Sequence, residues 1–484
     1  MLETGDFIRI RFQDEARNRK PIGIHWLQTA AVALLSTPEG TAIWPYRLPS
    51  ALAATVAVLL TAALGATLLS SRRAGLVAGV VMASALGLVV EAHLAKTDAA
   101  LLAAIVAGQL ALGIVYVRAR AGHPVKWQLA VGFWTAQAAG ILLKGPAAST
   151  LALLTVATLS IADRDIRWLK TLRPLAGLAL TMLIATPWFV AIEEATAGRF
   201  LAESVWQDLV PKLVSAQESH GAPPGTYLAL SLASFWPGSL FLVSAVVSGW
   251  RQRRAPTQRF LIAWLFPAWA LFELMPTKLP HYVLPLYPAL ALLAGGALAH
   301  GFRIRLTGCL RWVANVVSVL WGAVTITLAA ALVALPNWLG SGTSSRAIIA
   351  SAALLVLAPS LLINRRRPFL AACLVGALAA VFVLPMASVV VAGLDLLWLS
   401  RAAAALVARH LRRAGEPVLS VGAPADQQLS GAGMALVGDR EDAAFRKSLA
   451  TRRLNLRAID RVTGLDYSAG GGRVILTLYD MEQR

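Results

Sequence analysis

Apolar runs of about twenty residues, separated by short polar stretches, dominate this chain between residues 50 and 394. A helix that crosses a membrane needs about 20 mostly apolar residues. The pattern therefore predicts an all-α polytopic membrane bundle of about twelve transmembrane helices. The expected spans lie near residues 50–70, 74–92, 99–117, 128–143, 147–162, 174–192, 226–248, 260–276, 282–299, 312–335, 346–363 and 368–394.

Basic residues gather in every second connection between these spans. Lysine and arginine are concentrated in cytoplasmic loops, so this alternation predicts which connections are cytoplasmic. It places the loop 193–225 and the C-terminus on the periplasmic side of an inner membrane. The basic connections are residues 72–73, 118–126, 164–173, 251–259, 303–311 and 365–367.

The N-terminal segment has two interpretations. Its basic residues between Arg9 and Lys20 would lie outside, against the charge rule, unless residues 22–37 form an additional span. That stretch is short and contains His25 and Gln28. A helix lying in the membrane interface is the favoured interpretation.

Beyond about Arg401 the composition becomes polar and no further span is expected. Short apolar runs predict strands at 417–421, 434–437 and 473–479, a helix at 441–450, and a glycine turn at 470–472. We therefore expect a small C-terminal α/β periplasmic domain. The expected division is an N-terminal periplasmic or interfacial segment (1–49), a membrane domain (50–394) and a soluble domain (395–484).

Composition supports the membrane class and excludes others. The 484 residues are 57% hydrophobic and 14% charged, whereas soluble domains are about 25% charged. The formal net charge of +19 does not indicate a nucleic-acid partner, because the basic residues are dispersed among short loops. The first twenty residues contain no apolar signal-peptide core.

Three polar islands interrupt the apolar pattern, and all three are expected on the same outer rim. Ionisable residues at the ends of membrane helices usually mark a functional site. Asp98 is a candidate general base, although an N-terminal cap of the following helix by Thr97 or Asp98 would also explain it. The islands are residues 91–98, 144–146 and 278–282.

Lysines at this rim are candidates for binding a phosphate group. Lys144 follows an apolar run in a Lys-Gly-Pro turn, where it could instead only anchor a hairpin at the headgroups. Tyr282 lies between prolines and could equally be a residue of the aromatic belt. The long loop 193–225, with His220, is a candidate lid or a plain solvated loop.

The order of several motifs resembles the polyprenyl-phosphate-dependent glycosyltransferases of the GT-C fold. The nearest resemblance is to the aminoarabinose transferase and protein O-mannosyltransferase-like family, over residues 1 to about 300. The matching motifs are Gly5-Asp6, Lys20-Pro21 with Trp26-Leu27, Arg47-Leu48-Pro49, Thr97-Asp98-Ala99, Lys144-Gly145-Pro146, Thr186-Pro187-Trp188, Phe235-Trp236-Pro237 and Lys278 through Pro285.

The resemblance implies a sugar donor carried on polyprenyl phosphate and no nucleotide. Asp98 would deprotonate or orient the acceptor, and Lys20, Lys144 and Lys278 would neutralise the departing phosphate. Tyr282 would line the same cavity. Other expected cavity-lining residues are Glu91, His93, Lys96 and His281. No cofactor is certain: a divalent metal is left open, because the spacing of the histidines identifies no metal site.

Two departures from the family pattern affect this expectation. Members of the family carry an acidic motif on a first outer loop, upstream of the Gly-Asp that matches Gly5-Asp6. No such motif precedes Gly5 here, which suggests a late start or the loss of the principal catalytic aspartate. Arg19 also stands where the family often has an acidic residue before Lys-Pro.

The expected function is sugar transfer to a lipid acceptor such as lipid A, with a protein hydroxyl as the second choice. The active site would face the periplasm. The alternatives are a transporter of a lipid-linked sugar or small anion, and a catalytically inactive truncated homologue. A transporter is disfavoured because transporters usually carry polar or broken helices at mid-membrane, whereas the polar residues here gather at one rim.

Overall fold

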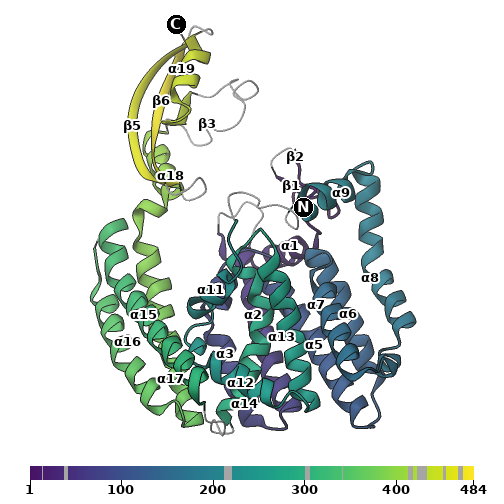
Figure 1. Cartoon of the computed structure of the whole chain (residues 1–484). Coiled ribbons are helices and arrows are strands. Elements are labelled where there is room, and N and C mark those ends of the chain that lie inside the picture. Colours follow the sequence, from purple (N-terminus) through teal and green to yellow (C-terminus); the bar gives the residue numbers. More distant parts are fainter. Residues whose placement is uncertain are drawn as a thin grey trace. The chain divides into compact units, whose positions relative to one another are not determined.

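A computed structural model describes most of the chain. The described residues are 1–12, 15–36, 42–211, 221–299, 306–340, 342–411, 418–421, 433–450, 454–466 and 472–483. They pack into two compact units (Figure 1). The first comprises residues 1–326 and 355–380, and the second comprises residues 327–354 and 381–484.

Helices make up almost all of the first unit, because a helix satisfies its own backbone hydrogen bonds inside apolar surroundings. Two short antiparallel strands of two residues each, β1 (Arg11–Phe12) and β2 (Glu15–Ala16), precede the helices. The helices are α1 (Gly23–Leu35), α2 (Trp44–Leu68), α3 (Arg72–Ser84), α4 (Leu86–Ala92), α5 (Asp98–Arg120), α6 (Trp127–Lys144), α7 (Ala147–Asp163), η1 (Arg167–Leu172), α8 (Pro174–Ala195), α9 (Arg199–Ala202), η2 (Glu203–Leu209), α11 (Thr226–Ser234), η3 (Gly238–Phe241), α12 (Leu242–Arg251), α13 (Pro256–Leu274), η4 (Pro280–Leu286) and α14 (Tyr287–Ala299). Three long helices, α15 (Gly308–Leu339), α16 (Ser345–Asn364) and α17 (Pro368–Pro385), contribute to both units.

Within the described ranges, seven helices are long and apolar enough to cross a membrane, and the bent pair α3–α4 would make an eighth. The prediction of a mostly helical, multi-pass membrane bundle is thereby confirmed. Each of the twelve expected spans lies on helical structure, in some cases on consecutive short helices. The full count of twelve stays a prediction.

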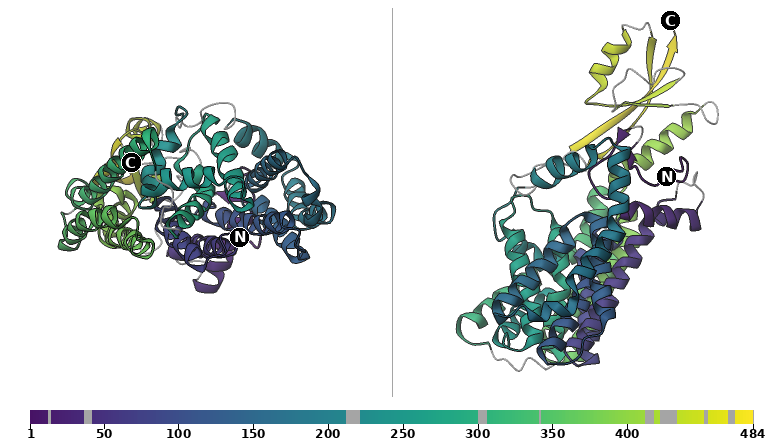
Figure 2. Two further views of the ribbon diagram at one scale, coloured as in Figure 1. Left: turned by 60° about the horizontal axis from the view of Figure 1, so that its bottom comes forward. Right: turned by 90° about the vertical axis from the view of Figure 1, so that its right-hand side faces the viewer.

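Helix α1 is too short to span a bilayer. Its 13 residues rise about 20 Å at 1.5 Å per residue, less than the hydrocarbon core of about 30 Å. Figure 2 shows α1, in purple, running across one end of the bundle rather than along it. The interfacial placement of this segment remains a prediction, and the helix length agrees with it.

The centre of the bundle is formed by η4 and α14, and 89% of their 18-residue apolar stretch is buried. Small residues allow close packing around it. A Cβ atom on Gly295 of α14 would lie 2.8 Å from the Ala74 carbonyl oxygen of α3, and one on Gly75 would lie 2.4 Å from the Ala62 carbonyl oxygen of α2. The packing of α2, α3 and α14 therefore depends on glycine at both positions.

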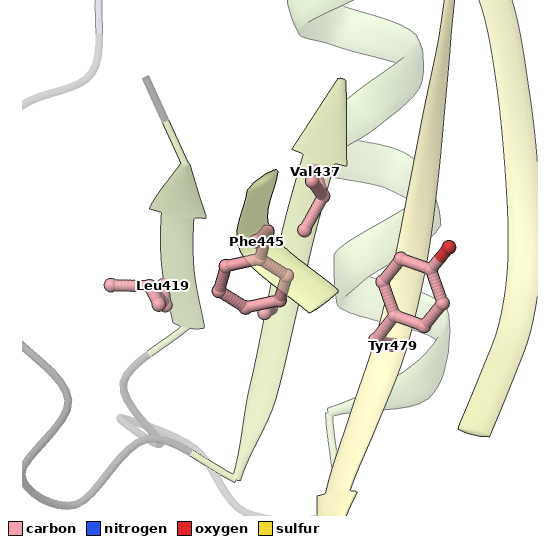
Figure 3. Close-up of a cluster of buried hydrophobic side chains, with 5 residues drawn as sticks. Leu419, Val437, Phe445 and Tyr479 are labelled. Atoms are coloured by element: carbon pink, nitrogen blue, oxygen red, sulfur yellow. The ribbon is translucent and has the colours of Figure 1, made fainter. Parts of the chain in front are cut away.

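The described residues of the second unit contain a four-stranded mixed sheet of order β3-β4-β6-β5. Strands β3 and β4 pair in parallel, and the other described pairs are antiparallel. One buried hydrophobic cluster of this unit contains Leu419, Ala435, Val437, Phe445 and Tyr479. Figure 3 shows the side chains of Leu419, Val437, Phe445 and Tyr479. The elements are η5 (Met386–Val390), η6 (Val391–Gly393), η7 (Asp395–Leu397), α18 (Leu399–His410), β3 (Val418–Val421), β4 (Met434–Gly438), α19 (Asp442–Ala450), β5 (Leu454–Asp466) and β6 (Gly472–Gln483).

Predictions for this C-terminal region were mostly correct in element type. The expected strands coincide with β3, β4 and β6, and the expected helix with α19. Strand β5 and helix α18 were not predicted. In β5, charged residues such as Arg457 and Asp460 lie among the apolar ones and obscure the strand pattern. The expected turn at 470–472 falls largely outside the described residues.

Candidate active site

A break between α3 and α4 brings the first carboxylate of the site into the bundle. The two helices meet at 64°, and Ala85 between them is extended, with ψ of 117°. The Leu86 N–H donates to the Trp236 carbonyl oxygen at 3.3 Å, which satisfies a group that the break exposes. Glu91 near the end of α4 is 5% exposed, and no hydrogen-bond partner of its Oε2 lies in the described part of the chain.

Asp98 and Lys144 form an ion pair between two helix ends. Asp98 opens α5 and Lys144 closes α6, and Lys144 Nζ lies 2.5 Å from Asp98 Oδ1. Gly145 follows in a left-handed conformation, with φ of 62°, so that the chain can reverse at this point. Thr97 makes no side-chain cap hydrogen bond. The capping interpretation of Thr97 is therefore wrong.

His281 lies between the two carboxylates. Its Nε2 is 3.8 Å from Asp98 Oδ1, and its Nδ1 is 3.8 Å from Glu91 Oε1. The imidazole also meets the Tyr282 ring edge-on, at 5.1 Å between centroids. Lys144 Nζ lies 5.5 Å from the centroid of that tyrosine ring. Four separate chain segments thus converge at one end of the bundle.

Lys278 belongs to the same turn but makes different contacts. Its Nζ donates to the main-chain carbonyl oxygens of Glu273 at 2.9 Å and Met275 at 2.6 Å. These carbonyls lie at the C-terminal end of α13, where helix carbonyls lack partners and attract positive charge. The side chain is 7% exposed and faces the Tyr227 ring at 5.7 Å. Its hydrogen bonds therefore complete a helix end.

The N-terminal segment packs beside the Lys144 turn. A Cβ atom on Gly23 would lie 2.7 Å from the Leu142 carbonyl oxygen, so α1 directly touches the end of α6. Trp188 Nε1 donates to the Ile8 carbonyl oxygen at 3.2 Å and ties the segment to α8. Lys20, although exposed, acts electrostatically on both Asp98 and His281.

The remaining predicted site residues lie at the edge of this cluster or outside the described chain. His93 and Lys96 are both exposed. The His93 Nδ1 lies 2.7 Å from the Val89 carbonyl oxygen, whereas the Lys96 charge acts on Glu91. His220 lies outside the described residues.

The charges of the cluster favour an anion over a divalent metal. Glu91, Asp98 and His281 offer ligand atoms within 4.8 Å of one another, a set that metals can use. However, a cation would have to displace Lys144 from Asp98. The charges of Lys144, Lys20 and Lys96, which act on His281, outnumber the two carboxylates. These surroundings do not fit a divalent cation, and no step below involves one.

Two residues to which the sequence assigned no role shape this end of the bundle. Glu273 accepts the N–H groups of Gly225 at 2.8 Å and Leu228 at 3.0 Å, and so caps α11. Tyr227 is fully buried beside Lys278. An acidic residue near a helix end is an available signal for such a cap, whereas a tyrosine there is also typical of the aromatic belt.

Comparison with known proteins agrees with this architecture. Residues 28–201 match the family described as dolichyl-phosphate-mannose-protein mannosyltransferase. The crystal structure of ArnT from Cupriavidus metallidurans bound to undecaprenyl phosphate superposes with a TM-score of 0.70, covering 99% of this chain and 91% of that chain. At 19% sequence identity this likeness establishes the fold. The chain is a multi-pass membrane protein with an ArnT-like fold.

Curated relatives of this chain include transferases that are named for one reaction. It is 28% identical over 306 residues to "undecaprenyl phosphate-alpha-4-amino-4-deoxy-L-arabinose arabinosyl transferase 1" of Pseudomonas fluorescens, covering 62% of this chain and 53% of the relative. It is 30% identical over 308 residues to the corresponding transferase of Pseudomonas aeruginosa, covering 63% and 54%. The chain thus spans about half the length of these relatives. The resemblance found in the sequence motifs is confirmed by this homology.

Proposed function

We propose that this protein is a membrane glycosyltransferase that moves a sugar from undecaprenyl phosphate to a lipid acceptor such as lipid A. The donor sugar would be an amino sugar of the 4-amino-4-deoxy-L-arabinose type, as the names of the relatives suggest. A protein acceptor is the second choice. The observation that carries the proposal is the convergence of Asp98, Lys144, His281 and Tyr282 at one end of an ArnT-like bundle.

In this proposal Lys144 stabilises the departing phosphate, and Asp98 acts on the acceptor oxygen. An ammonium carries three N–H donors, so Lys144 can keep its contact with Asp98 while donating to a phosphate oxygen. Lys20 adds a second positive charge at the same place, and Lys278 is proposed as a third. Charge that develops on the departing phosphate is thereby neutralised, which lowers the barrier to breaking its bond to the sugar.

Asp98 would receive or orient the acceptor oxygen on the opposite face of the sugar. The site would open to the periplasm, since the basic connections are predicted to be cytoplasmic. The bundle would contain about twelve spans, within the proposed membrane domain of residues 50–394. The flanking domains would be residues 1–49 and 395–484, the latter also periplasmic.

The Asp98→Asn variant tests this function. Full-length protein in bilayers is supplied with undecaprenyl-phosphate-linked aminoarabinose and lipid A, and the glycosylated product is measured by mass spectrometry. We expect product from the wild type and loss of at least about 100-fold in the variant, in the range of general-base contributions. Asp439→Asn, an exposed position in the C-terminal unit, is the matched control.

The result also separates the proposal from its rival. Full activity of Asp98→Asn would remove Asp98 from the mechanism. Accumulation of the donor inside sealed vesicles without any covalent product would favour a transporter instead. Normal membrane insertion of each variant is checked in the same preparations.

A further inference from the structure

A set of arginines lies at the end of the bundle opposite Asp98. Asp98 begins α5, and Arg120 ends this helix of 23 residues, so the two ends are about 33 Å apart at 1.5 Å per residue. Arg120 Nε lies 3.5 Å from Asp163 Oδ2, and Arg259 of α13 pairs with Oδ1 of the same carboxylate. The N-terminal end of α13 is therefore far from the proposed active site, at the end of the bundle where Figure 1 shows α12.

Two turns that are distant in sequence meet at this end. One turn joins α2 to α3, and the other joins α12 to α13. Thr257 Oγ1, in the first turn of α13, donates to the Leu68 carbonyl oxygen at the end of α2 at 3.0 Å. Neither residues 68–73 nor residues 250–259 include an aspartate or a glutamate. The two turns carry exposed arginines, which we call the arginine cluster: Arg72, Arg73, Arg251, Arg253 and Arg254.

The charge of the arginine cluster is not compensated within the described part of the chain. Asp163 is the acid that the second turn approaches, but its side chain is 0% exposed and is already paired with Arg120 and Arg259. Apart from that of Arg253, the guanidinium groups of the cluster make no hydrogen bond or ion pair with a described residue. Like charges held together at a surface attract ions of the opposite sign. The cluster therefore fits an anionic ligand.

Arg259 fixes the backbone from which part of the cluster projects. Its Nε donates to the Arg253 carbonyl oxygen at 3.3 Å, and its Nη2 donates to the Arg254 carbonyl oxygen at 3.4 Å. The same guanidinium is paired with Asp163 at the end of α7. The turn between α12 and α13 is thereby tied to a third helix, so its arginines are presented from a held backbone.

Two exposed aromatic rings lie directly beside the cluster. The Arg253 guanidinium stacks over the Trp250 ring at 5.0 Å from its centroid, and Arg253 Nη1 donates to the Trp250 carbonyl oxygen at 3.0 Å. The Trp250 ring meets that of Phe266 edge-on, at 5.7 Å between centroids. The two residues are 49% and 40% exposed. A ligand at this place therefore meets apolar rings and guanidinium groups together.

We propose that the arginine cluster binds the headgroup of an anionic phospholipid in the leaflet opposite the active site. Guanidinium groups bind phosphate oxygens through paired N–H donors. The acyl chains of the same molecule would cover Trp250 and Phe266, which a free phosphate would leave exposed. The basic connections are predicted to face the cytoplasm, and anionic lipids of that leaflet attract basic segments next to membrane helices. This inference does not depend on the proposed sugar transfer.

The charge rule by itself does not account for this arrangement. It places arginines on one side of the membrane, and a dispersed set would satisfy it. It requires neither the contact between Thr257 and Leu68 nor an arginine stacked on an exposed tryptophan. These contacts gather positive charge and aromatic surface at one place, which suits a ligand with a phosphate group and acyl chains.

Native mass spectrometry of the full-length protein tests this site. Purified protein is titrated with phosphatidylglycerol, or with phosphatidylethanolamine of the same acyl chains, and the bound lipids are counted. We expect the wild type to bind phosphatidylglycerol more tightly. Each basic residue near an anionic headgroup contributes about 5-fold in affinity. Arg251→Gln combined with Arg254→Gln should therefore weaken binding of phosphatidylglycerol by about 25-fold and leave that of phosphatidylethanolamine unchanged.

Arg366→Gln combined with Arg367→Gln is the matched control. It removes the same charge from the exposed connection between α16 and α17, which is predicted to lie on the same side of the membrane. It should keep the wild-type preference. Arg251→Lys combined with Arg254→Lys should keep part of it, because an ammonium retains the charge but not the paired donors. Thermal unfolding without added lipid should be the same in all variants, which would exclude a folding defect.

The contrary outcomes are distinct. Equal binding of the two lipids by the wild type, or an unchanged preference after loss of Arg251 and Arg254, would overturn the proposal. Equal losses in the paired glutamine variants of the cluster and of the control would show general attraction of charge instead of a site. Displacement of phosphatidylglycerol by inorganic phosphate at equal concentration would replace the lipid with a free anion. Each of these results leaves the proposed sugar transfer untouched, since that activity is measured separately.

Discussion

The Lys144 ammonium lies 2.5 Å from the Asp98 carboxylate, across 46 residues of sequence. Their side chains are 24% and 12% exposed, respectively. The burial of this pair is therefore intermediate between that of a solvated surface pair and that of a fully buried pair. Because each residue ends or begins a helix, the pair also fastens α5 to α6 at the proposed active site.

Removing one member of this pair should cost more than removing both. Exposed pairs contribute about 0–1 kcal/mol, whereas breaking a buried pair costs about 3–5 kcal/mol. We expect Lys144→Met to lower the free energy of unfolding by about 1–3 kcal/mol, between those limits. Adding Asp98→Asn should restore part of that loss, since it removes the unpaired charge. Thermal unfolding of purified protein measures the order of the three variants.

Lys126→Met is the control for that series, because Lys126 is an exposed lysine that precedes the other end of α6. It should leave the unfolding temperature unchanged. A double variant that is less stable than Lys144→Met alone would contradict the coupling of Lys144 to Asp98.

Lys278 offers a test between two roles for one side chain. Its ammonium donates to the carbonyls of Glu273 and Met275, and hydrogen bonds of charged groups contribute about 1.5–3 kcal/mol each. We expect Lys278→Met to destabilise the protein by about 2–4 kcal/mol. Its affinity for undecaprenyl phosphate should fall less than that of Lys144→Met. Loss of donor affinity without loss of stability would instead assign Lys278 to the phosphate.

How much of this site the sequence predicts differs from residue to residue. The alternation of basic loops placed Asp98, Lys144 and His281 on one rim, and these side chains do meet. The sequence predicted that Lys278 lies on this rim, but it did not predict which groups its ammonium contacts. Which carbonyl or carboxylate a lysine reaches depends on local backbone geometry that span counting does not contain.

Glu91 shows a second limit. Residues 74–92 predicted one continuous span, and nothing in that pattern, such as a proline, marks the break at Ala85. The break depends on tertiary contacts, including the carbonyl of Trp236 from a distant segment. The inward position of Glu91 follows from that break. Strand β5 was missed for a different reason, since its charged residues disrupt the apolar signal of a strand.

Glu273 should control the order of the first turn of α11. Its two carboxylate oxygens accept the N–H groups of Gly225 and Leu228, which otherwise lack helical partners. Loss of such a cap costs about 0.5–2 kcal/mol. We expect faster hydrogen–deuterium exchange at residues 226–229 in Glu273→Ala, and a smaller change in Glu273→Gln, which keeps one acceptor oxygen. Exchange as slow as in the wild type in both variants would contradict the cap.

His25 in α1 should make the N-terminal segment sensitive to acid. Burial, with the nearby charges of Arg17 and Lys20, lowers the pKa of His25 below its ordinary value of 6.5. The unfolded chain therefore binds a proton at a higher pH than the folded one does. Stability is fully present above pH 6.5 and is lost as the pH falls from 6.5 through the folded-state pKa. We expect the unfolding temperature of the wild type to fall between pH 7.5 and pH 5.5, and to fall less in His25→Gln. His123→Gln, at an exposed loop histidine, should follow the wild type.

Equal pH slopes for wild type and His25→Gln would show that the histidine is as easily protonated in the folded protein as in the unfolded chain. The packing of α1 beside the Lys144 turn would then not depend on a neutral His25.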